Sequence, residues 1–144
     1  MKEKSNKSLL VYRFSSFGDI AMIVPVLRAF YQAYPDQKII FVSRAFIKPL
    51  FEEFSNIRFI AADFKNQHKG LKGLLKLYKD LKKEKIIAVA DLHGVIRTFV
   101  LNFFFRASFY KVALINNGTI QWYGKVTEIY DTKNNFLNNF LKVV

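Results

Sequence analysis

Ser8-Leu9-Leu10-Val11-Tyr12 followed by Arg13-Phe14-Ser15-Ser16-Phe17-Gly18-Asp19 is the stretch that decides the fold of this chain. The short, continuously apolar run at residues 8–12 predicts a buried strand. Apolar side chains then recur at helical spacing from residue 20 to residue 31, which predicts an amphipathic helix. Residues 13–19 are therefore a strand-to-helix turn, and Asp19 lies in the first turn of the helix. Ligands bind at the carboxyl ends of strands in open α/β sheets, so this turn is a candidate site.

Strand-like and helix-like segments alternate along the following part of the chain. We expect further strands at residues 37–43, 57–61, 85–91 and 110–115, and helices at 45–54, 70–84 and 95–105. This alternation predicts an α/β fold, a Rossmann-like parallel sheet with helices on both faces. The expected strand order, numbered along the chain, is 3-2-1-4-5. That order brings residues 13–19 beside residues 91–97.

The chain of 144 residues has the length of one domain, and we assign residues 1–115 to the Rossmann-like domain. The pattern weakens after the turn signal Asn117-Gly118, so residues 116–144 are expected to be irregular or weakly helical. The chain has no cysteine, which excludes disulfides and thiolate chemistry. Two histidines and scattered acids show no metal-ligand spacing, so no metal site is expected.

The charge balance of 23 basic against 11 acidic residues, a net +12, favours an anionic partner. The lysine-rich face of residues 70–84 could meet lipid headgroups, although a solvated face is the commoner use. Nucleic acid is not the expected partner, because the aromatic residues follow core periodicity and do not interleave with basic ones. No apolar run reaches the ~18 residues of a membrane span. We therefore expect a cytoplasmic protein, with peripheral contact at the inner membrane left open.

Several motifs, in this order, resemble glycosyltransferase family 9, the ADP-heptose:lipopolysaccharide heptosyltransferases of Gram-negative bacteria. The opening of the family is similar to Arg13-Phe14-Ser15-Ser16-Phe17-Gly18-Asp19-Ile20 followed by Val24-Pro25-Val26-Leu27-Arg28-Ala29-Phe30. Ala33-Tyr34-Pro35-Asp36 also resembles the family, as does Asp91-Leu92-His93-Gly94 with Arg97-Thr98. The family usually has Asp-Leu-Gln-Gly where this chain has His93.

The resemblance covers residues 8 to about 105, and the Ser-Ser-x-Gly-Asp turn is its most specific part. It implies the acceptor-binding, N-terminal half of an inverting GT-B glycosyltransferase, an enzyme of two Rossmann-like domains that works without a metal. The implied acceptor is lipopolysaccharide inner core or another phosphorylated saccharide. Family members are more than twice as long, so the C-terminal domain that holds the nucleotide-sugar is absent here. Transfer by this chain alone is therefore expected to be incomplete.

The resemblance also assigns roles to residues of the two loops. It implies that Asp19 is the catalytic base; position alone favours the commoner roles of helix capping and dipole compensation. No cofactor is implied beyond a nucleotide-sugar co-substrate such as ADP-heptose. Substrate binding is expected from Arg13, Ser15, Ser16, Gly18, His93 and Arg97. Simpler roles for these residues are a tight turn, a surface ion pair and, for the histidine, a structural hydrogen bond.

Two other functions compete with the glycosyltransferase. One is a non-catalytic, basic Rossmann-like module that binds anionic lipid or nucleic acid. The other is a flavodoxin-like nucleotide or receiver domain, which we rank last because the first loop lacks an acidic pair. A further expectation concerns the Phe-rich segment 99–105, which we expect to pack on the sheet. If it is exposed, it forms a docking patch for the missing domain or for a membrane.

Overall fold

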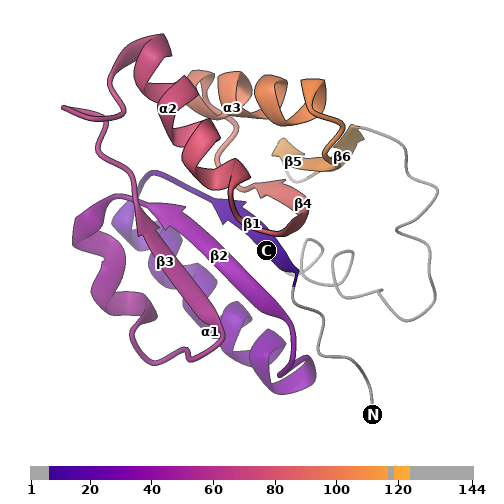
Figure 1. Cartoon of the computed structure of the whole chain (residues 1–144). Coiled ribbons are helices and arrows are strands. Elements are labelled where there is room, and N and C mark those ends of the chain that lie inside the picture. Colours follow the sequence, from indigo (N-terminus) through magenta and orange to yellow (C-terminus); the bar gives the residue numbers. More distant parts are fainter. Residues whose placement is uncertain (1–6, 117–118, 124–144) are drawn as a thin grey trace.

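A six-stranded sheet forms the centre of the computed structural model, which describes residues 7–116 and 119–123 (Figure 1). In chain order its strands are β1 (Ser8–Tyr12), β2 (Lys38–Ser43), β3 (Ile57–Ala61), β4 (Ile86–Asp91), β5 (Val112–Asn116) and β6 (Thr119–Tyr123). Their order across the sheet is β3-β2-β1-β4-β5-β6. Neighbouring strands are parallel except that β6 runs antiparallel to β5. The predicted order 3-2-1-4-5 of the Rossmann-like fold is confirmed.

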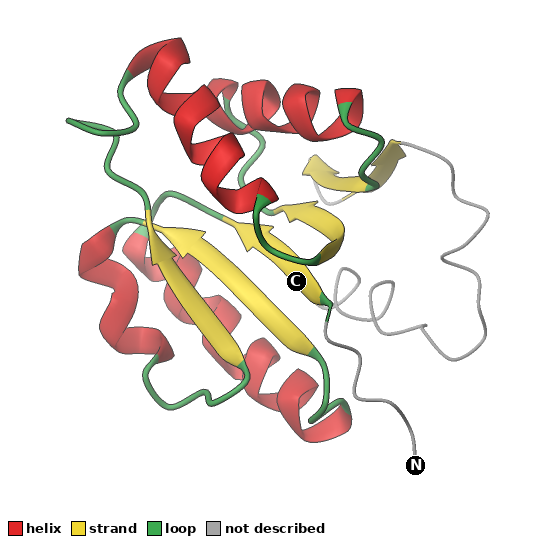
Figure 2. Cartoon of the chain, in the orientation of Figure 1, coloured by secondary structure: helices red, strands yellow, loops and turns green. Residues whose placement is uncertain are grey.

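Helices cover both faces of the sheet, as the red ribbons of Figure 2 show. One face carries α1 (Phe17–Ala33) and the 3-10 helix η1 (Ala45–Phe51), and the other carries α2 (Gly70–Lys82) and α3 (Ile96–Ala107). The segment at 45–51 forms tighter 3-10 turns where the sequence predicted a short helix up to residue 54. It contains Pro49, which has no N–H to donate to a helical hydrogen bond.

β1 is covered on both sides, which explains its unbroken apolar sequence. Leu9 and Val11 point into the core under α1 and η1, whereas Leu10 and Tyr12 point into the core under α2 and α3. All four side chains are completely buried. Burial of one such aliphatic side chain contributes about 1.5–3 kcal/mol. The loop that follows β1 therefore leaves the sheet from a firmly held point.

β6 corrects one sequence-based expectation. It lies within residues 116–144, which we expected to be irregular or weakly helical, and pairs with β5 from Val112↔Tyr123 to Asn116↔Thr119. A signal for it was present, since Thr, Ile, Trp and Tyr are strand formers and follow an Asn-Gly pair typical of hairpins. Residues 124–144 lie outside the described part, so the expectation for them stays untested.

α2 begins in close contact with the loop that precedes it. The N–H of Asp63 donates to Nδ1 of His68 over 2.9 Å, and the N–H of His68 donates to the carbonyl oxygen of Asp63 over 2.7 Å. The backbone of His68 is so near the helix that a Cβ on Gly73 would lie 2.1 Å from the His68 carbonyl carbon. Glycine is therefore required at position 73, because the His68 backbone leaves no room for a Cβ. The hydrogen bonds with Asp63 give His68 a structural role.

The Phe-rich segment packs on the sheet only in part. On α3, Leu101 and Phe105 are completely buried, as expected, but Phe99 and Phe103 are exposed. Within the described ranges 7–116 and 119–123, no helix combines the length and the apolar character needed to cross a bilayer.

Candidate active site

Two loops meet where β1 and β4 end side by side. Tyr12 and Asp91 are partners in the register of the two strands, and the N–H of Leu92 donates to the carbonyl oxygen of Tyr12 over 3.1 Å. The loop after β1 and the loop after β4 thus leave the sheet at the same point. This is the switch point at which open α/β sheets bind ligands, as the sequence predicted.

The backbone of the first loop is fixed on its other side by β2. The N–H of Arg13 donates to the carbonyl oxygen of Val42 over 3.3 Å, and the hydroxyl of Ser43 donates to the carbonyl oxygen of Arg13 over 2.6 Å. Ser43 is completely buried. Sequence analysis did not single out Ser43, although a polar residue at the end of an apolar strand could have indicated a contact with the neighbouring loop.

Asp19 is held at the start of α1 by two side chains. Nη2 of Arg13 lies 2.8 Å from its Oδ2, and the hydroxyl of Ser16 donates to the same oxygen over 2.9 Å. Its side chain is nevertheless 55% exposed. The Ser16 hydrogen bond first, and then the Arg13 charge, lower the pKa of Asp19. Asp19 is therefore an ionised carboxylate that is oriented by the protein and open to a ligand.

Arg13 also connects the two loops. While its Nη2 pairs with Asp19, its Nη1 donates to the carbonyl oxygen of Leu92 over 2.5 Å. The guanidinium thus joins the loop after β4 to the first turn of α1. Sequence analysis expected Arg13 to bind substrate; the structure places it beside the candidate base, where it also orients that base.

His93, in the loop after β4, forms hydrogen bonds with the loop after β1. The backbone N–H of Phe14 donates to Nδ1 over 3.3 Å, and Nε2 lies 3.2 Å from the hydroxyl oxygen of Ser15. Burial first, and then the charge of Arg13, lower the pKa of His93. Because Nδ1 accepts an N–H, the neutral ring carries its proton on Nε2 and donates to Ser15. The hydroxyl proton of Ser15 remains available for a ligand.

A buried chain of polar groups holds the second loop. The hydroxyl of Tyr12 donates to Oδ1 of Asn102, and Nδ2 of Asn102 donates to Oδ2 of Asp91 over 2.7 Å. Oδ1 of Asp91 accepts the backbone N–H groups of His93, over 2.9 Å, and Gly94, over 3.0 Å. Burial raises the pKa of Tyr12. Sequence analysis missed Tyr12 and Asn102; the sequence shows a polar Asn within an apolar, Phe-rich helix, but it does not show the partners of that side chain.

The remaining predicted residues lie around this centre. The Arg97 guanidinium lies over the ring of Phe64, 5.0 Å from its centroid, and Phe64 packs edge-on against Phe14 with 4.5 Å between centroids. The ring of Phe64 thus lies between Arg97 and Phe14 of the first loop. Gly18 lies in the first turn of α1, where a Cβ would meet no atom within 4 Å. The space beside Gly18 is therefore open.

The site is positively charged apart from its two carboxylates. Arg13 and Arg44 both lie near enough to lower the pKa of His93 by their charge. Such a cluster suits an anionic group on a ligand. In the part of the chain that the structure describes, no three His, Cys, Asp or Glu side chains are placed to hold a metal ion.

Comparison with known proteins points to one kind of enzyme, although no family model matches the chain. The chain is 28% identical over 103 residues to the lipopolysaccharide core heptosyltransferase OpsX of Haemophilus influenzae, which covers 72% of this chain and 29% of that protein. Its fold is similar to that of a glycosyl transferase family 9 protein from Veillonella parvula, with a TM-score of 0.64 and 22% identity over 94% of this chain and 42% of that one. It is also similar to the E. coli heptosyltransferase WaaC with ADP, with a TM-score of 0.54 and 21% identity over 65% of this chain and 32% of that one.

The fold and the position of the two loops define a Rossmann-like unit of the type that builds GT-B glycosyltransferases. The comparisons also confirm the resemblance to the heptosyltransferases of glycosyltransferase family 9 that the sequence motifs predicted. The chain spans 29% of the length of the curated relative and 42% and 32% of the two solved chains. The resemblance therefore concerns one part of those proteins.

Proposed function

We propose that this chain is the acceptor-binding half of a heptosyltransferase-like glycosyltransferase, which transfers a sugar from a nucleotide-sugar to lipopolysaccharide core or a related saccharide. The observation that carries the proposal is Asp19, an ionised and half-exposed carboxylate at the switch point of the sheet. The similarity to OpsX supports the choice of reaction.

Asp19 acts as the general base of an inverting transfer. A hydroxyl oxygen of the acceptor forms a bond to the anomeric carbon of the sugar, and the bond from that carbon to the phosphate oxygen of the donor breaks. The hydroxyl proton passes to the Asp19 carboxylate, and the nucleoside diphosphate leaves with the electron pair. General-base assistance of this kind contributes about 10²–10⁴-fold to the rate.

The lowered pKa of Asp19 decides when the proton moves. A carboxylate with a low pKa is a weak base toward a free hydroxyl, but it is fully ionised at neutral pH. The hydroxyl becomes acidic only as its oxygen bonds to the anomeric carbon. Proton transfer to Asp19 therefore belongs late in the step, and Arg13 and Ser16 keep the carboxylate aimed until then.

The acceptor lies across the two loops in this proposal. Ser15, Ser16 and the open side of Gly18 meet its hydroxyl groups, and His93 positions Ser15. Arg97 binds an anionic group such as a phosphate on the saccharide. The nucleotide-sugar, for example ADP-heptose, binds to a donor domain outside this chain, and no further cofactor takes part. The reaction takes place at the cytoplasmic face of the inner membrane of a Gram-negative bacterium.

Saccharide binding by the full chain tests the proposal. Calorimetry with a phosphorylated inner-core saccharide should show saturable binding, and Arg97→Gln should weaken it about tenfold by removing a charge-assisted hydrogen bond. Asp19→Asn should change affinity by less than threefold, because a base acts in the transition state. In an assay supplied with the donor domain, the same variant should lower transfer at least about 100-fold. Asp36→Asn, an exposed acid away from the site, is the matched control.

Two results would count against the proposal. Transfer at the normal rate by Asp19→Asn would exclude Asp19 as the base. Failure to bind the saccharide, together with DNA binding that weakens steeply with salt, would favour the non-catalytic basic module.

A further inference from the structure

α3 turns a stripe of large apolar side chains toward solvent. Ile96, Phe99 and Phe103 are 82%, 47% and 66% exposed, whereas Leu101 and Phe105 on the opposite side are completely buried. At about 100° per residue, positions 96, 99 and 103 fall on one side of the helix. The exposed apolar groups are therefore ordered along α3 and are not scattered.

α2 extends this stripe into a groove. Leu71 and Leu75, which are 65% and 36% exposed, face α3 across the surface. The groove between the two helices has a volume of about 600 Å³, and among the described residues that line it only Lys72 is charged. A contiguous exposed apolar surface of this kind marks an interaction site, because soluble proteins rarely leave such a surface in contact with water.

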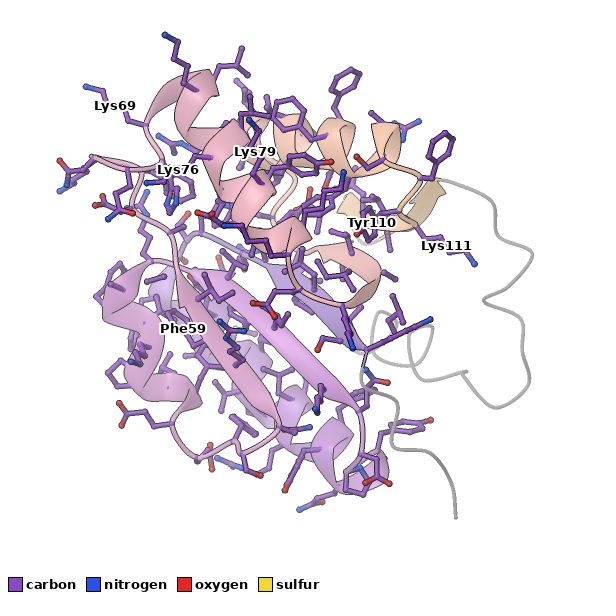
Figure 3. The ribbon with its side chains drawn as sticks, viewed as in Figure 1. Phe59, Lys69, Lys76, Lys79, Tyr110 and Lys111 are labelled. Atoms are coloured by element: carbon purple, nitrogen blue, oxygen red, sulfur yellow. The ribbon has the colours of Figure 1, made fainter. Side chains whose placement is uncertain are left out.

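Lysines run beside the apolar groove on α2. Lys72 and Lys79 are seven residues apart, so they lie on the same side of the helix, before and after Leu75. Both are exposed, and Figure 3 shows Lys69 just before α2 and Lys76 and Lys79 along it. One face of the molecule thus combines insertable apolar side chains with a row of positive charge.

This face continues toward Arg97 and the loop that follows β4. A second hollow, of about 630 Å³, is lined by Gly94, Val95, Ile96, Arg97 and Phe99. It shares Ile96 and Phe99 with the groove, and Gly94 belongs to the loop that Asp91 holds. A partner that covers the groove therefore lies beside Arg97 and the loop after β4.

We propose that the α2–α3 face, defined by Leu71, Leu75, Ile96, Phe99, Phe103, Lys72 and Lys79, docks on the surface of an anionic lipid bilayer. Its apolar side chains insert at the boundary between headgroups and acyl chains, and the long lysine side chains reach the lipid phosphates. Charge complementarity selects this occupant, since the exposed Lys72 and Lys79 accompany the apolar side chains on α2 and the whole chain carries a net charge of +12. The docking depends on this surface and not on the chemistry of Asp19.

Vesicle flotation of the full chain tests the proposal. Vesicles of phosphatidylglycerol and phosphatidylcholine should bind the protein, and vesicles of phosphatidylcholine alone should bind at least tenfold more weakly. The double variant Ile96→Ser/Phe103→Ser should lose at least tenfold in affinity. Lys72→Gln/Lys79→Gln should lose about fivefold for each lysine removed, and this loss should disappear at high salt.

Matched controls are available on the opposite side of the sheet. Met22 on α1 and Phe46 on η1 are 74% and 60% exposed, and Lys48 is exposed on η1. Met22→Ser/Phe46→Ser and Lys48→Gln should bind vesicles as the unchanged protein does. Circular dichroism of every variant should keep the helical signal, because all of these side chains are exposed.

Three results would overturn the proposal. The first is unchanged vesicle binding by Ile96→Ser/Phe103→Ser, and the second is an equal loss in the control variants. The third is a dimer in the absence of vesicles that Ile96→Ser/Phe103→Ser dissociates, which would identify a second copy of the chain as the occupant. Because saccharide binding is a separate measurement, failure of the docking and failure of the transferase function remain distinguishable.

Discussion

Nη2 of Arg13 lies 2.8 Å from Oδ2 of Asp19 and joins the end of β1 to the first turn of α1. The same guanidinium reaches the loop after β4 through the carbonyl oxygen of Leu92. One side chain thus helps Ser16 to keep the candidate base ionised and also links the two loops.

Replacement of Arg13 should make Asp19 easier to protonate. The Ser16 hydrogen bond and the Arg13 charge lower the pKa of Asp19, so their stabilisation is present at neutral pH and is lost as pH falls through the folded-state pKa. Arg13→Gln should therefore raise the pKa of Asp19, and the acid limb of transfer should move to higher pH. Carbon-13 NMR titration of the carboxyl group measures the change. Arg28→Gln, which breaks the exposed pair with Glu53, should leave the Asp19 titration unchanged.

His93 should be neutral at pH 7, with its proton on Nε2. Burial and the Arg13 charge lower the pKa of His93. The stability that the neutral, bridging ring contributes is therefore fully present above the ordinary histidine pKa of about 6.5, and it is lost as pH falls through the folded-state pKa. Nitrogen-15 NMR of the ring reports the tautomer, and the spectrum of His93→Gln separates its signal from that of His68. Saccharide affinity should fall at acidic pH. It should fall several-fold in His93→Ala and much less in His93→Gln, which retains both a donor and an acceptor. A proton on Nδ1 at neutral pH would contradict the assignment.

Removal of Asn102 should destabilise the fold more than its size suggests. Asn102→Ala leaves the buried Tyr12 hydroxyl without its partner and removes the hydrogen bond to Oδ2 of the buried Asp91, whose Oδ1 keeps the N–H groups of His93 and Gly94. An unsatisfied buried group costs about 1–3 kcal/mol, so the free energy of unfolding should fall by about 3 kcal/mol. Urea unfolding measures this value, and Gln67→Ala in an exposed loop is the control. A loss below about 1 kcal/mol would show that water replaces the Asn102 amide.

Two glycine-to-alanine variants should have opposite consequences. Gly73→Ala places a Cβ 2.1 Å from the His68 backbone, so the start of α2 must move and thermal unfolding should occur at a markedly lower temperature. Gly18→Ala meets no atom within 4 Å and improves helix propensity by up to about 1 kcal/mol, so stability should be kept or raised. If an acceptor occupies the space beside Asp19, Gly18→Ala should nevertheless weaken saccharide binding. Equal stability of the two variants would contradict the close approach at Gly73.

Most of the scaffold was predictable because its signals are local. The apolar run of β1, the helical spacing after it and the alternation of elements led to the correct strand order and to the meeting of the two loops. Motif resemblance led to Asp19 and His93, which the structure places near one another. Whether these residues perform the proposed roles stays a prediction.

Long-range pairing explains what the sequence could not predict. The partnership of Asn102 with Asp91 and Tyr12 crosses from α3 to two strands, and no local pattern records it. The exposure of Phe103 was equally hidden, because helical spacing alone does not tell which apolar side chains reach the sheet. β6 is a different case, because the strand-forming residues after Asn117-Gly118 were a local signal that the interpretation of residues 116–144 did not use.

The buried chain from Tyr12 through Asn102 to Asp91 ties two strands and a helix to the loop that carries His93. A loop supported in this way has little freedom to adapt, so recognition must come from the few side chains that project beyond it. Exchanging Ser15 or Arg97 could therefore redirect the preference for one saccharide over another while the framework stays intact. If the proposed function holds, the residues of this buried chain must be preserved, whereas the projecting side chains can change, so that single substitutions should give new acceptor specificities.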